Sequence, residues 1–429
     1  MMKLGTAQID ITPKPGGELS GFAARVQPST GLLDPLFAKA LYIETKEAKL
    51  LWIHCDLIGF DRSMVLEFRR WARERLGMSA HQVMLSATHT HAGPATIHLR
   101  EAGEYDLAYA DFLQHKLRQA AEMAVAQMEI VGLTCVEGRL GLAVDRRKTA
   151  TPHTDPRVAA IGFCRDDGRF SAILVNYAVH PVALGSKNRC ISADIFGGAA
   201  THLSQALPGS PVVLVTNGAC GNLNPPAENV SFEQVKSWGR QIADAVQPLL
   251  QAGAVNFQAT LQVLTRTMEL PLDQLDAEGI NQFAENAQRN PAALAEWGDK
   301  YRRVVGHWRA TLLERAGKND DSHHEVELFG ILLGDMFFIG ANAEVFAEFT
   351  DLLRKGAKRQ IYLVGYANGD VGYLPTRAAY AEGGYEVEVA HLFYGGFRPR
   401  AGVLELLACA AQKLVCQLDE KAASSAELK

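Results

Sequence analysis

The sequence predicts an α/β fold with mixed sheets, and two observations carry this prediction. The apolar runs 50–58 and 172–179 have the length and composition of buried strands. Each run is followed by a helical pattern and then by a second apolar strand, at 83–88 and at 211–215. Strand–helix–strand units of this kind are expected to be parallel and right-handed. If both units share one sheet, their strand ends lie at the same edge of that sheet.

The other elements follow from apolar periodicity and from turn residues. Strands are expected at 6–11, 38–45, 133–137, 158–163 and 361–365, with a hairpin over 327–338 that turns at Gly334-Asp335. Helices are expected over 63–76, 105–127, 197–206, 231–250, 343–355 and 402–418. Gly77 ends the first helix, and Ser231 with Gln234 forms a capping box at the start of the fourth.

The expected organisation is one domain over residues 1–418. Within it, residues 272–318 are polar and helix-forming, and we expect them to form a helical insertion. Residues 419–429 are expected to be a disordered tail.

Composition excludes several classes of function. The chain has 429 residues, 48% of them hydrophobic, and a net charge of −5, with no basic stripe of the kind that binds nucleic acid. It has no apolar run long enough to cross a membrane and no apolar segment of a signal peptide at its start. Its seven cysteines are scattered and form no C-x-x-C pair. That pattern indicates reduced thiols in a cytoplasmic protein, without a disulfide framework or a cysteine zinc site.

The most informative segment is Ser86–Pro94, which sets His89 and His91 one residue apart at the end of a strand. Alternate residues of a strand point to the same face, so both imidazoles should share one face. His180 ends the second apolar strand, and the polar loop 217–225 follows its partner strand. Ligands of parallel α/β sheets bind beyond the carboxyl ends of the strands, and these groups all lie at such ends.

Two readings of these residues stay open at this point. A catalytic zinc takes three or four nitrogen or oxygen ligands, and His89 and His180 are the best candidates, with Glu344 as a carboxylate at another strand end. Alternatively, each histidine is a hydrogen-bonded residue at a strand end. Glu344 is then a first-turn glutamate that favours the helix dipole.

Several segments of the chain are similar to motifs of one known family. Ser86–Pro94 resembles the S-A-T-H-T-H-S-G-P signature of the neutral ceramidases, and Ala7–Thr12 resembles the A-D-I-T start of that family. The segments Asn176–Pro181, Ala343–Phe346 and Gly372–Glu386 resemble its second histidine, G-E-F and tyrosine-rich motifs. The likeness spans nearly the whole chain.

The resemblance implies a layered α/β/β/α catalytic domain with a mononuclear Zn²⁺ site. His89, His180, Glu344 and Tyr373 would be the metal ligands. His91, Arg146 and Tyr385 would line the substrate side, with Arg147 as the alternative to Arg146. From the residues alone, Tyr373 is equally a core or rim aromatic.

The departures from the family concern its catalytic serine. Ceramidases carry G-D-(V/M)-S-P-N where this chain has Gly221-Asn222-Leu223-Asn224-Pro225, so Asn224 replaces the serine and Asn222 the aspartate. An amide cannot act as a nucleophile. We interpret Cys220 as structural, and Asp194 either as a partner that orients a ligand histidine or as a helix N-cap. We also expect no C-terminal β-sandwich domain and no export signal, so ceramide is not the expected substrate.

The leading hypothesis is a zinc-dependent hydrolase that uses metal-activated water on an amide bond of a polar, soluble small molecule. His91 and Arg146 would stabilise the oxyanion or move the proton, while Asn224 and Tyr385 would orient the substrate. One alternative is another metal-assisted chemistry at the same site, namely glycoside cleavage, lactone opening or isomerisation. A second is a catalytically silent zinc-binding protein. The substrate and the oligomeric state, a homo-oligomer included, stay open.

Overall fold

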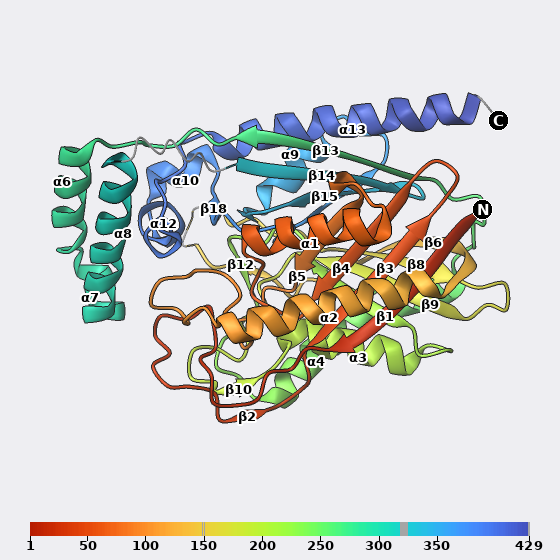
Figure 1. Cartoon of the computed structure of the whole chain (residues 1–429), viewed down its shortest axis with the longest axis horizontal. Helices are drawn as coiled ribbons and strands as arrows, with labels where there is room; N and C mark the ends of the chain where they lie inside the picture. The colour runs from red at the N-terminus through yellow and green to blue at the C-terminus, as the bar shows by residue number, and fades with distance from the viewer. Residues whose placement is uncertain (148, 150, 318–324, 428–429) are drawn as a thin grey trace.

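Two β-sheets lie face to face between two layers of helices in the computed structural model, which describes residues 1–147, 149, 151–317 and 325–427 (Figure 1). One core cluster lies between the sheets and takes side chains from both, including Trp52 and Phe338. A second cluster joins the larger sheet to its helices, and a third joins the smaller sheet to the long C-terminal helix. The predicted layered α/β/β/α fold is confirmed.

The larger sheet is mixed and has the strand order β11-β9-β8-β6-β1-β3-β4-β5. Its strands are β1 (Met2–Asp10), β3 (Phe37–Glu44), β4 (Lys49–Cys55), β5 (Val83–Ala87), β6 (Met128–Arg139), β8 (Arg157–Cys164), β9 (Phe170–Tyr177) and β11 (Val212–Asn217). The pairs β4–β5 and β9–β11 are parallel, as the two strand–helix–strand units predict.

The smaller sheet has the order β13-β14-β15-β17 and includes the predicted hairpin. Its strands are β13 (Leu261–Glu269), β14 (Glu325–Leu333), β15 (Met336–Ala341) and β17 (Gln360–Val364). Three two-stranded ladders pair β2 (Gly31–Leu32) with β10 (Cys190–Ile191), β7 (Val144–Asp145) with β12 (Leu223–Asn224), and β16 (Glu344–Val345) with β18 (Tyr373–Leu374).

Helices cover the outer face of each sheet. The helices of the molecule are α1 (Arg62–Leu76), the 3₁₀ turn η1 (Ala80–Gln82), α2 (Leu107–Ala126), α3 (Asp194–Ala206), α4 (Phe232–Asp244), α5 (Gln247–Ala252), α6 (Ala277–Ala287), α7 (Pro291–Trp297), α8 (Asp299–Gly317), α9 (Glu348–Arg354), α10 (Arg377–Glu382), α11 (Tyr385–Glu388), α12 (Ala390–Tyr394) and α13 (Val403–Glu427). Helices α6, α7 and α8 pack together at one end of the molecule, beside the two sheets (Figure 1). None of the helices, over the described residues, is long and apolar enough to cross a membrane.

The structure corrects two of the expected elements. The predicted helix 343–355 begins only at Glu348, because Glu344 and Val345 form β16 and the Glu344 N–H donates to Gly372 O. Helix α13 continues to Glu427 through most of the expected disordered tail. These residues contain no helix breaker, and Arg359 pairs with Asp419 at the start of the extension.

The two edge strands of the larger sheet, β5 and β11, are brought together by the loop that follows β17. Gly365 N–H donates to Asn217 O at the end of β11, and Ala87 N–H at the end of β5 donates to Tyr366 O. His54 of β4 also contacts Val215 O of β11 at 2.9 Å. The sheet therefore curls, and the carboxyl ends of β5 and β9 reach the same place.

Candidate metal centre

Three histidines from two distant segments meet where the strand ends converge. One ring nitrogen of each of His89, His91 and His180 lies within 4.8 Å of the others. The ring centroids of His89 are 4.9 Å from His91 and 5.1 Å from His180. No pattern in the sequence required this meeting, because the two segments follow strands near opposite edges of the sheet.

The first two histidines reach the site in a way that the strand pattern did not predict. Strand β5 ends at Ala87, and His89 has a left-handed backbone with φ of 64°. A left-handed conformation is costly for a residue with a Cβ, and it breaks the alternation of faces that a strand would impose. His89 and His91 therefore share the site through a tight loop and not through a strand.

Hydrogen bonds fix the orientation of two imidazoles. Nδ1 of His89 is 2.6 Å from Ile58 O, and Nδ1 of His180 is 2.7 Å from Cys220 O. A carbonyl can only accept, so in each neutral ring Nδ1 carries the proton and Nε2 keeps its lone pair. Both Nε2 atoms face the carboxylate of Glu344, at 3.4 Å from His89 and 3.0 Å from His180.

Glu344 is a buried carboxylate placed by the β16–β18 ladder. Its Oε2 contacts both histidines, and its Oε1 accepts a hydrogen bond from the Tyr394 hydroxyl at 2.5 Å. Burial alone would raise its pKa, but the neighbouring His89 and His180 hold the pKa well below its ordinary value. The group is thus an anion held against two imidazoles, which is the donor set that zinc and similar divalent metals bind.

His91 differs from the other two histidines because both of its ring nitrogens are buried without a hydrogen-bond partner. Burial and the neighbouring His89 and His180 hold its pKa well below the ordinary value, so the ring is neutral. Its ring packs edge-on against Phe22 at 4.8 Å. Buried polar atoms are normally paired, so these orphaned nitrogens indicate that a metal, a water or a substrate completes the site.

Three residues at the centre were missed by the sequence analysis. Tyr366 stacks on His89 at 3.8 Å between ring centroids, and its hydroxyl lies 3.3 Å from both Glu344 Oε2 and His180 Nε2. The Tyr394 hydroxyl also donates to Asp370, whose pKa burial and the charge of Glu344 raise to about 7. The only signal for Tyr366 and Asp370 was the aromatic, glycine-rich loop after the strand at 361–365.

Tyr373, Arg146 and Tyr385 lie together beside the histidine cluster. Tyr373 pairs with Glu344 across the β16–β18 ladder, and its ring packs 5.7 Å from Tyr385 and 5.4 Å from the Arg146 guanidinium. Burial raises the pKa of both phenols well above neutrality, so both remain hydrogen-bond donors. The structure therefore brings the backbone of the expected ligand Tyr373 next to Glu344. The Tyr373 ring itself packs against Arg146 and Tyr385.

The Arg146 guanidinium is already engaged by the protein. Its Nε donates to Glu386 at 2.8 Å and a terminal nitrogen donates to Gly221 O at 2.9 Å. Arg147 donates to the other oxygen of Glu386, at 2.6 Å. Glu386 thus forms ion pairs with both arginines. A substrate could contact only those guanidinium nitrogens that these ion pairs leave available.

Hydrogen bonds tie the polar loop 217–225 to neighbouring segments of the site. Asn222 Oδ1 accepts from Ala347 N–H at 2.8 Å, which ties the loop to the segment that carries Glu344. Asn224 donates to Glu228 at 2.8 Å and accepts from Arg146 at 3.4 Å. Burial raises the pKa of the Cys220 thiol to about 12, so the thiol keeps its proton and does not act as a nucleophile.

Asp194 supports the site only indirectly. Its carboxylate accepts from the backbone N–H groups of Ala183 and Leu184, just after His180, and from Ile195 N–H. It contacts no ligand histidine. The contribution of Asp194 is to fix the turn that follows His180.

A pocket of about 680 Å³ opens onto the histidine cluster. Its walls come from the loop 21–24, from the loops that carry Arg146 and Asn224, and from the helical segment 277–317, which contributes Glu296 and Trp297. The predicted helical segment thus forms part of the site.

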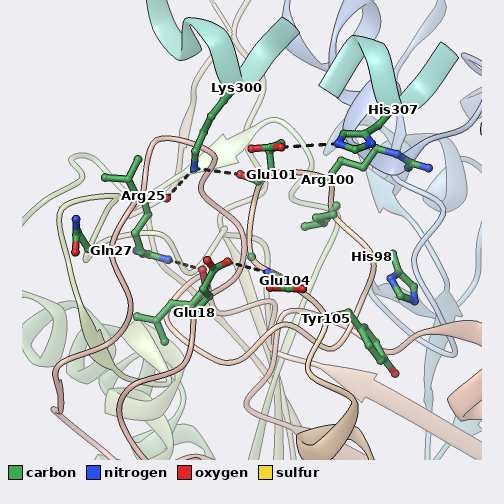
Figure 2. A pocket seen from close by; sticks show the side chains of 14 residues that line it. Glu18, Arg25, Gln27, His98, Arg100, Glu101, Glu104, Tyr105, Lys300 and His307 are labelled. Atoms are coloured by element: carbon green, nitrogen blue, oxygen red, sulfur yellow. Dashed lines mark hydrogen bonds and ion pairs between the residues drawn. The ribbon is translucent and has the colours of Figure 1, made fainter. Parts of the chain in front are cut away.

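A second pocket lies between helix α8 and the loops at 18–27 and 98–105 (Figure 2). Lys300 donates there to the carbonyl oxygens of Ala23, Arg25 and Glu101, as Figure 2 shows in part. Arg303 pairs with the Glu101 carboxylate at 2.8 Å. These contacts anchor the start of α8 to the loops beside the histidines.

Comparison with known proteins relates the chain to one family. Residues 2–143 match the sequence profile described as "Neutral/alkaline non-lysosomal ceramidase, N-terminal". The neutral ceramidase of Pseudomonas aeruginosa is 23% identical over 285 residues, which are 58% of this chain and 42% of that protein. The match therefore spans less than half of the relative's length.

The fold comparison covers more of the chain. The crystal structure of Pseudomonas aeruginosa neutral ceramidase superposes with a TM-score of 0.73 at 19% identity, over 97% of this chain and 75% of that one. A second solved chain, described as ceramidase complexed with C2, gives a TM-score of 0.73 at 17% identity, over 97% and 76%.

Proposed function

Because the chain is a relative of the neutral/alkaline ceramidases, we propose that it is a zinc-dependent hydrolase that cleaves an amide bond of a polar, soluble N-acyl compound. The observation that carries this proposal is the set of His89, His180 and Glu344, together with the orphaned ring nitrogens of His91. In the proposal, the first three residues and Tyr373 hold the metal. A divalent metal bound there supplies a Lewis acid and lowers the pKa of water.

The chain's own residues carry the remaining chemistry. His91 is neutral and has free ring nitrogens, so it is placed to accept a proton at one of them and to return it to the leaving amine nitrogen. Tyr385 stays protonated and can donate to the oxygen on which negative charge develops. Arg146 holds the Tyr373 ring from its pairing with Glu386.

A substrate other than ceramide is supported by the chemistry of the pocket. Its lining includes Arg146, Arg147, Asn224 and five glutamates beside its aromatic residues. In addition, the loop motif of this chain has Asn224 where the ceramidase motif has its catalytic serine. In the proposal, these charged and amide groups bind the polar part of a water-soluble substrate.

The test is metal content per chain in the wild type, His180→Ala and His91→Ala, measured by mass spectrometry, followed by hydrolysis of a panel of N-acyl amines. We expect one divalent metal in the wild type and in His91→Ala, and its loss in His180→Ala. Turnover should fall about 10²–10⁴-fold in His91→Ala, the range for a positioned acid–base group.

The matched control is His307→Ala, whose side chain is 61% exposed and lies outside the cluster. It should change neither metal content nor turnover. Metal that survives the loss of His180, or a metal-loaded wild type that releases no free amine from any member of the panel, would contradict the proposal. Release of a reducing end from glycosides assayed in parallel, without release of an amine from the panel, would point to a glycosidase.

A further inference from the structure

The charges that line the active-site pocket are unbalanced. Two arginines, Arg146 and Arg147, face five glutamates at positions 228, 296, 344, 382 and 386. A pocket with an excess of carboxylates attracts cations and repels anions. Cationic or imidazole groups of the protein already pair with some of these carboxylates.

Three of the five glutamates are engaged. Glu386 pairs with both arginines, at 2.8 Å and 2.6 Å. Glu382 pairs with Arg147 at 3.2 Å. Glu344 contacts His89 and His180 in the metal centre. These contacts use both arginines, so the pocket lining offers no further arginine to the remaining carboxylates.

Glu228 and Glu296 form no ion pair among the described residues, although the positive charge of Arg146 acts to lower the pKa of Glu228. Glu228 accepts a hydrogen bond from the Asn224 amide at 2.8 Å, and no lysine, arginine or histidine of the described residues forms an ion pair with Glu228 or Glu296. Partial burial raises the pKa of both groups, and the negative charge of Glu228 raises that of Glu296 further. Both carboxylates line the same pocket, although one follows β12 and the other lies on α7.

Aromatic side chains complete this part of the pocket. Trp297, next to Glu296, lies 5.9 Å from the Tyr385 ring and 5.5 Å from the Phe393 ring, and all three line the pocket. Carboxylates beside aromatic faces are the usual environment for an organic ammonium group, which gains both charge pairing and cation–π attraction.

The position of Glu296 and Trp297 is fixed by the anchor of the helical segment. Lys300 lies three residues after Trp297 and donates to three backbone carbonyls of the loops at 23–25 and 101 (Figure 2). One of these loops, 21–24, is itself a wall of the active-site pocket and packs Phe22 on His91. The helical segment is thus held against the loops beside the reacting groups.

We propose that the substrate carries a positively charged amine, which Glu228 and Glu296 bind at the mouth of the pocket while its acyl bond lies at the histidine cluster. This inference rests on the proposed function, since it names the class of N-acyl compound that the same pocket accepts. It assigns to Asn224 the role of a positioning residue, whose amide donates to Glu228 and accepts from Arg146.

The test is calorimetric binding at pH 7 of two sulfonamides that cannot be hydrolysed as amides. N-(4-aminobutyl)methanesulfonamide carries an ammonium group, and N-pentylmethanesulfonamide is its neutral isostere. The purified full chain is compared with the double variant Glu228→Gln/Glu296→Gln. The matched control is Glu285→Gln, an exposed glutamate of the same helical segment that does not line the pocket.

We expect the wild type and the control to bind the amine about tenfold more tightly than the isostere, and the double variant to lose this preference. Equal affinity for the two probes, no binding of either at millimolar concentration, or a preference that survives the double variant overturns the proposal. Turnover is not part of this readout. A protein that shows the preference but hydrolyses no N-acyl amine therefore contradicts the proposed function and leaves the amine site standing.

Discussion

The position of the His91 ring is set by the residues packed around it, because its ring nitrogens form no hydrogen bond. The other two histidines are tied through Nδ1 to carbonyls, whereas His91 is held by packing against Phe22 and by the close approach of Gly21. A Cβ at Gly21 would lie 2.4 Å from His91 Nδ1. The absence of a side chain at residue 21 is thus a condition for the position of His91.

Replacement of Gly21 by alanine should therefore impair catalysis without removing the metal. Gly21→Ala forces the His91 ring to shift, and we expect turnover to fall at least about tenfold, since a misplaced acid–base group loses much of its effect. Metal content should stay near the wild-type value, because His89, His180 and Glu344 are not displaced. Steady-state kinetics and mass spectrometry measure the two quantities.

Gly16→Ala is the matched control for this change. Gly16 also has a left-handed backbone, with φ of 119°, but nothing lies within 4 Å of the Cβ that it would gain. Both variants should lose about 1 kcal/mol of stability from backbone strain alone. Equal turnover in the two variants would show that the contact with His91 does not matter.

At the scale of elements, the N-terminus of α3 holds the segment that follows His180. Asp34 accepts hydrogen bonds from Ala193 N–H and from the Ser192 hydroxyl, and Asp194 in the first turn holds the backbone at 183 and 184. Burial raises the pKa of Asp34 to about 7, although the hydrogen bonds from Ser192 and Ala193 act to lower the pKa. The carboxyl group is therefore protonated in the folded state up to near neutral pH.

This raised pKa predicts a pH dependence of stability. The pKa of Asp34 lies above its unfolded value of 3.8, so its contribution is fully present below that value and is lost as the pH rises through about 7. Between pH 5 and pH 8 the wild type should lose about 2 kcal/mol of unfolding free energy through this group. Asp34→Asn should remove that loss. Urea unfolding at the two pH values measures it.

The exposed Asp111 on α2 provides the control for Asp34. Asp111→Asn should keep the wild-type difference between pH 5 and pH 8, because this change leaves Asp34 and its partners Ser192 and Ala193 in place. An Asp34→Asn protein that retained the full difference would assign the pH dependence to other groups.

At the scale of the whole molecule, the candidate metal centre takes its groups from parts of the chain that are far apart in the sequence. His89 follows edge strand β5, His180 follows β9 near the opposite edge, and Glu344 follows the smaller sheet. An unfolded chain does not present these groups together. A ligand that binds only the folded state stabilises it by mass action.

Metal binding should therefore raise the thermal stability of the whole chain. Zinc at about 100 times its dissociation constant should add about 2.7 kcal/mol, which is a rise of several degrees in the midpoint of thermal unfolding. A chelator should reverse the rise, and His180→Ala should show none. Differential scanning fluorimetry measures this shift. An equal shift in His180→Ala would place the stabilising metal elsewhere.

Local patterns were enough to predict an α/β fold and three of the residues at the centre, while the α/β/β/α layering came from the family resemblance. Buried strands are continuous apolar runs, and His89, His180 and Glu344 stand out because polar groups follow such runs. The bounds of the helix at 343–355 were wrong because the pairing of Glu344 with Tyr373 is a long-range contact. Tyr366, Tyr394 and Asp370 were missed for the same reason, since an aromatic or acidic residue in a loop has no local signature of its partner.

By itself, the sequence determined the fold class, the family resemblance and the histidines, because periodicity and short motifs are properties of neighbouring residues. Only the tertiary structure decided that the larger sheet curls until β5 and β9 end at one place, that His91 keeps two unpartnered nitrogens, and that Glu228 and Glu296 line the same pocket. Each of these facts depends on segments more than sixty residues apart. Their approach is set by the packing of two sheets and their helices, which no short stretch of the chain contains.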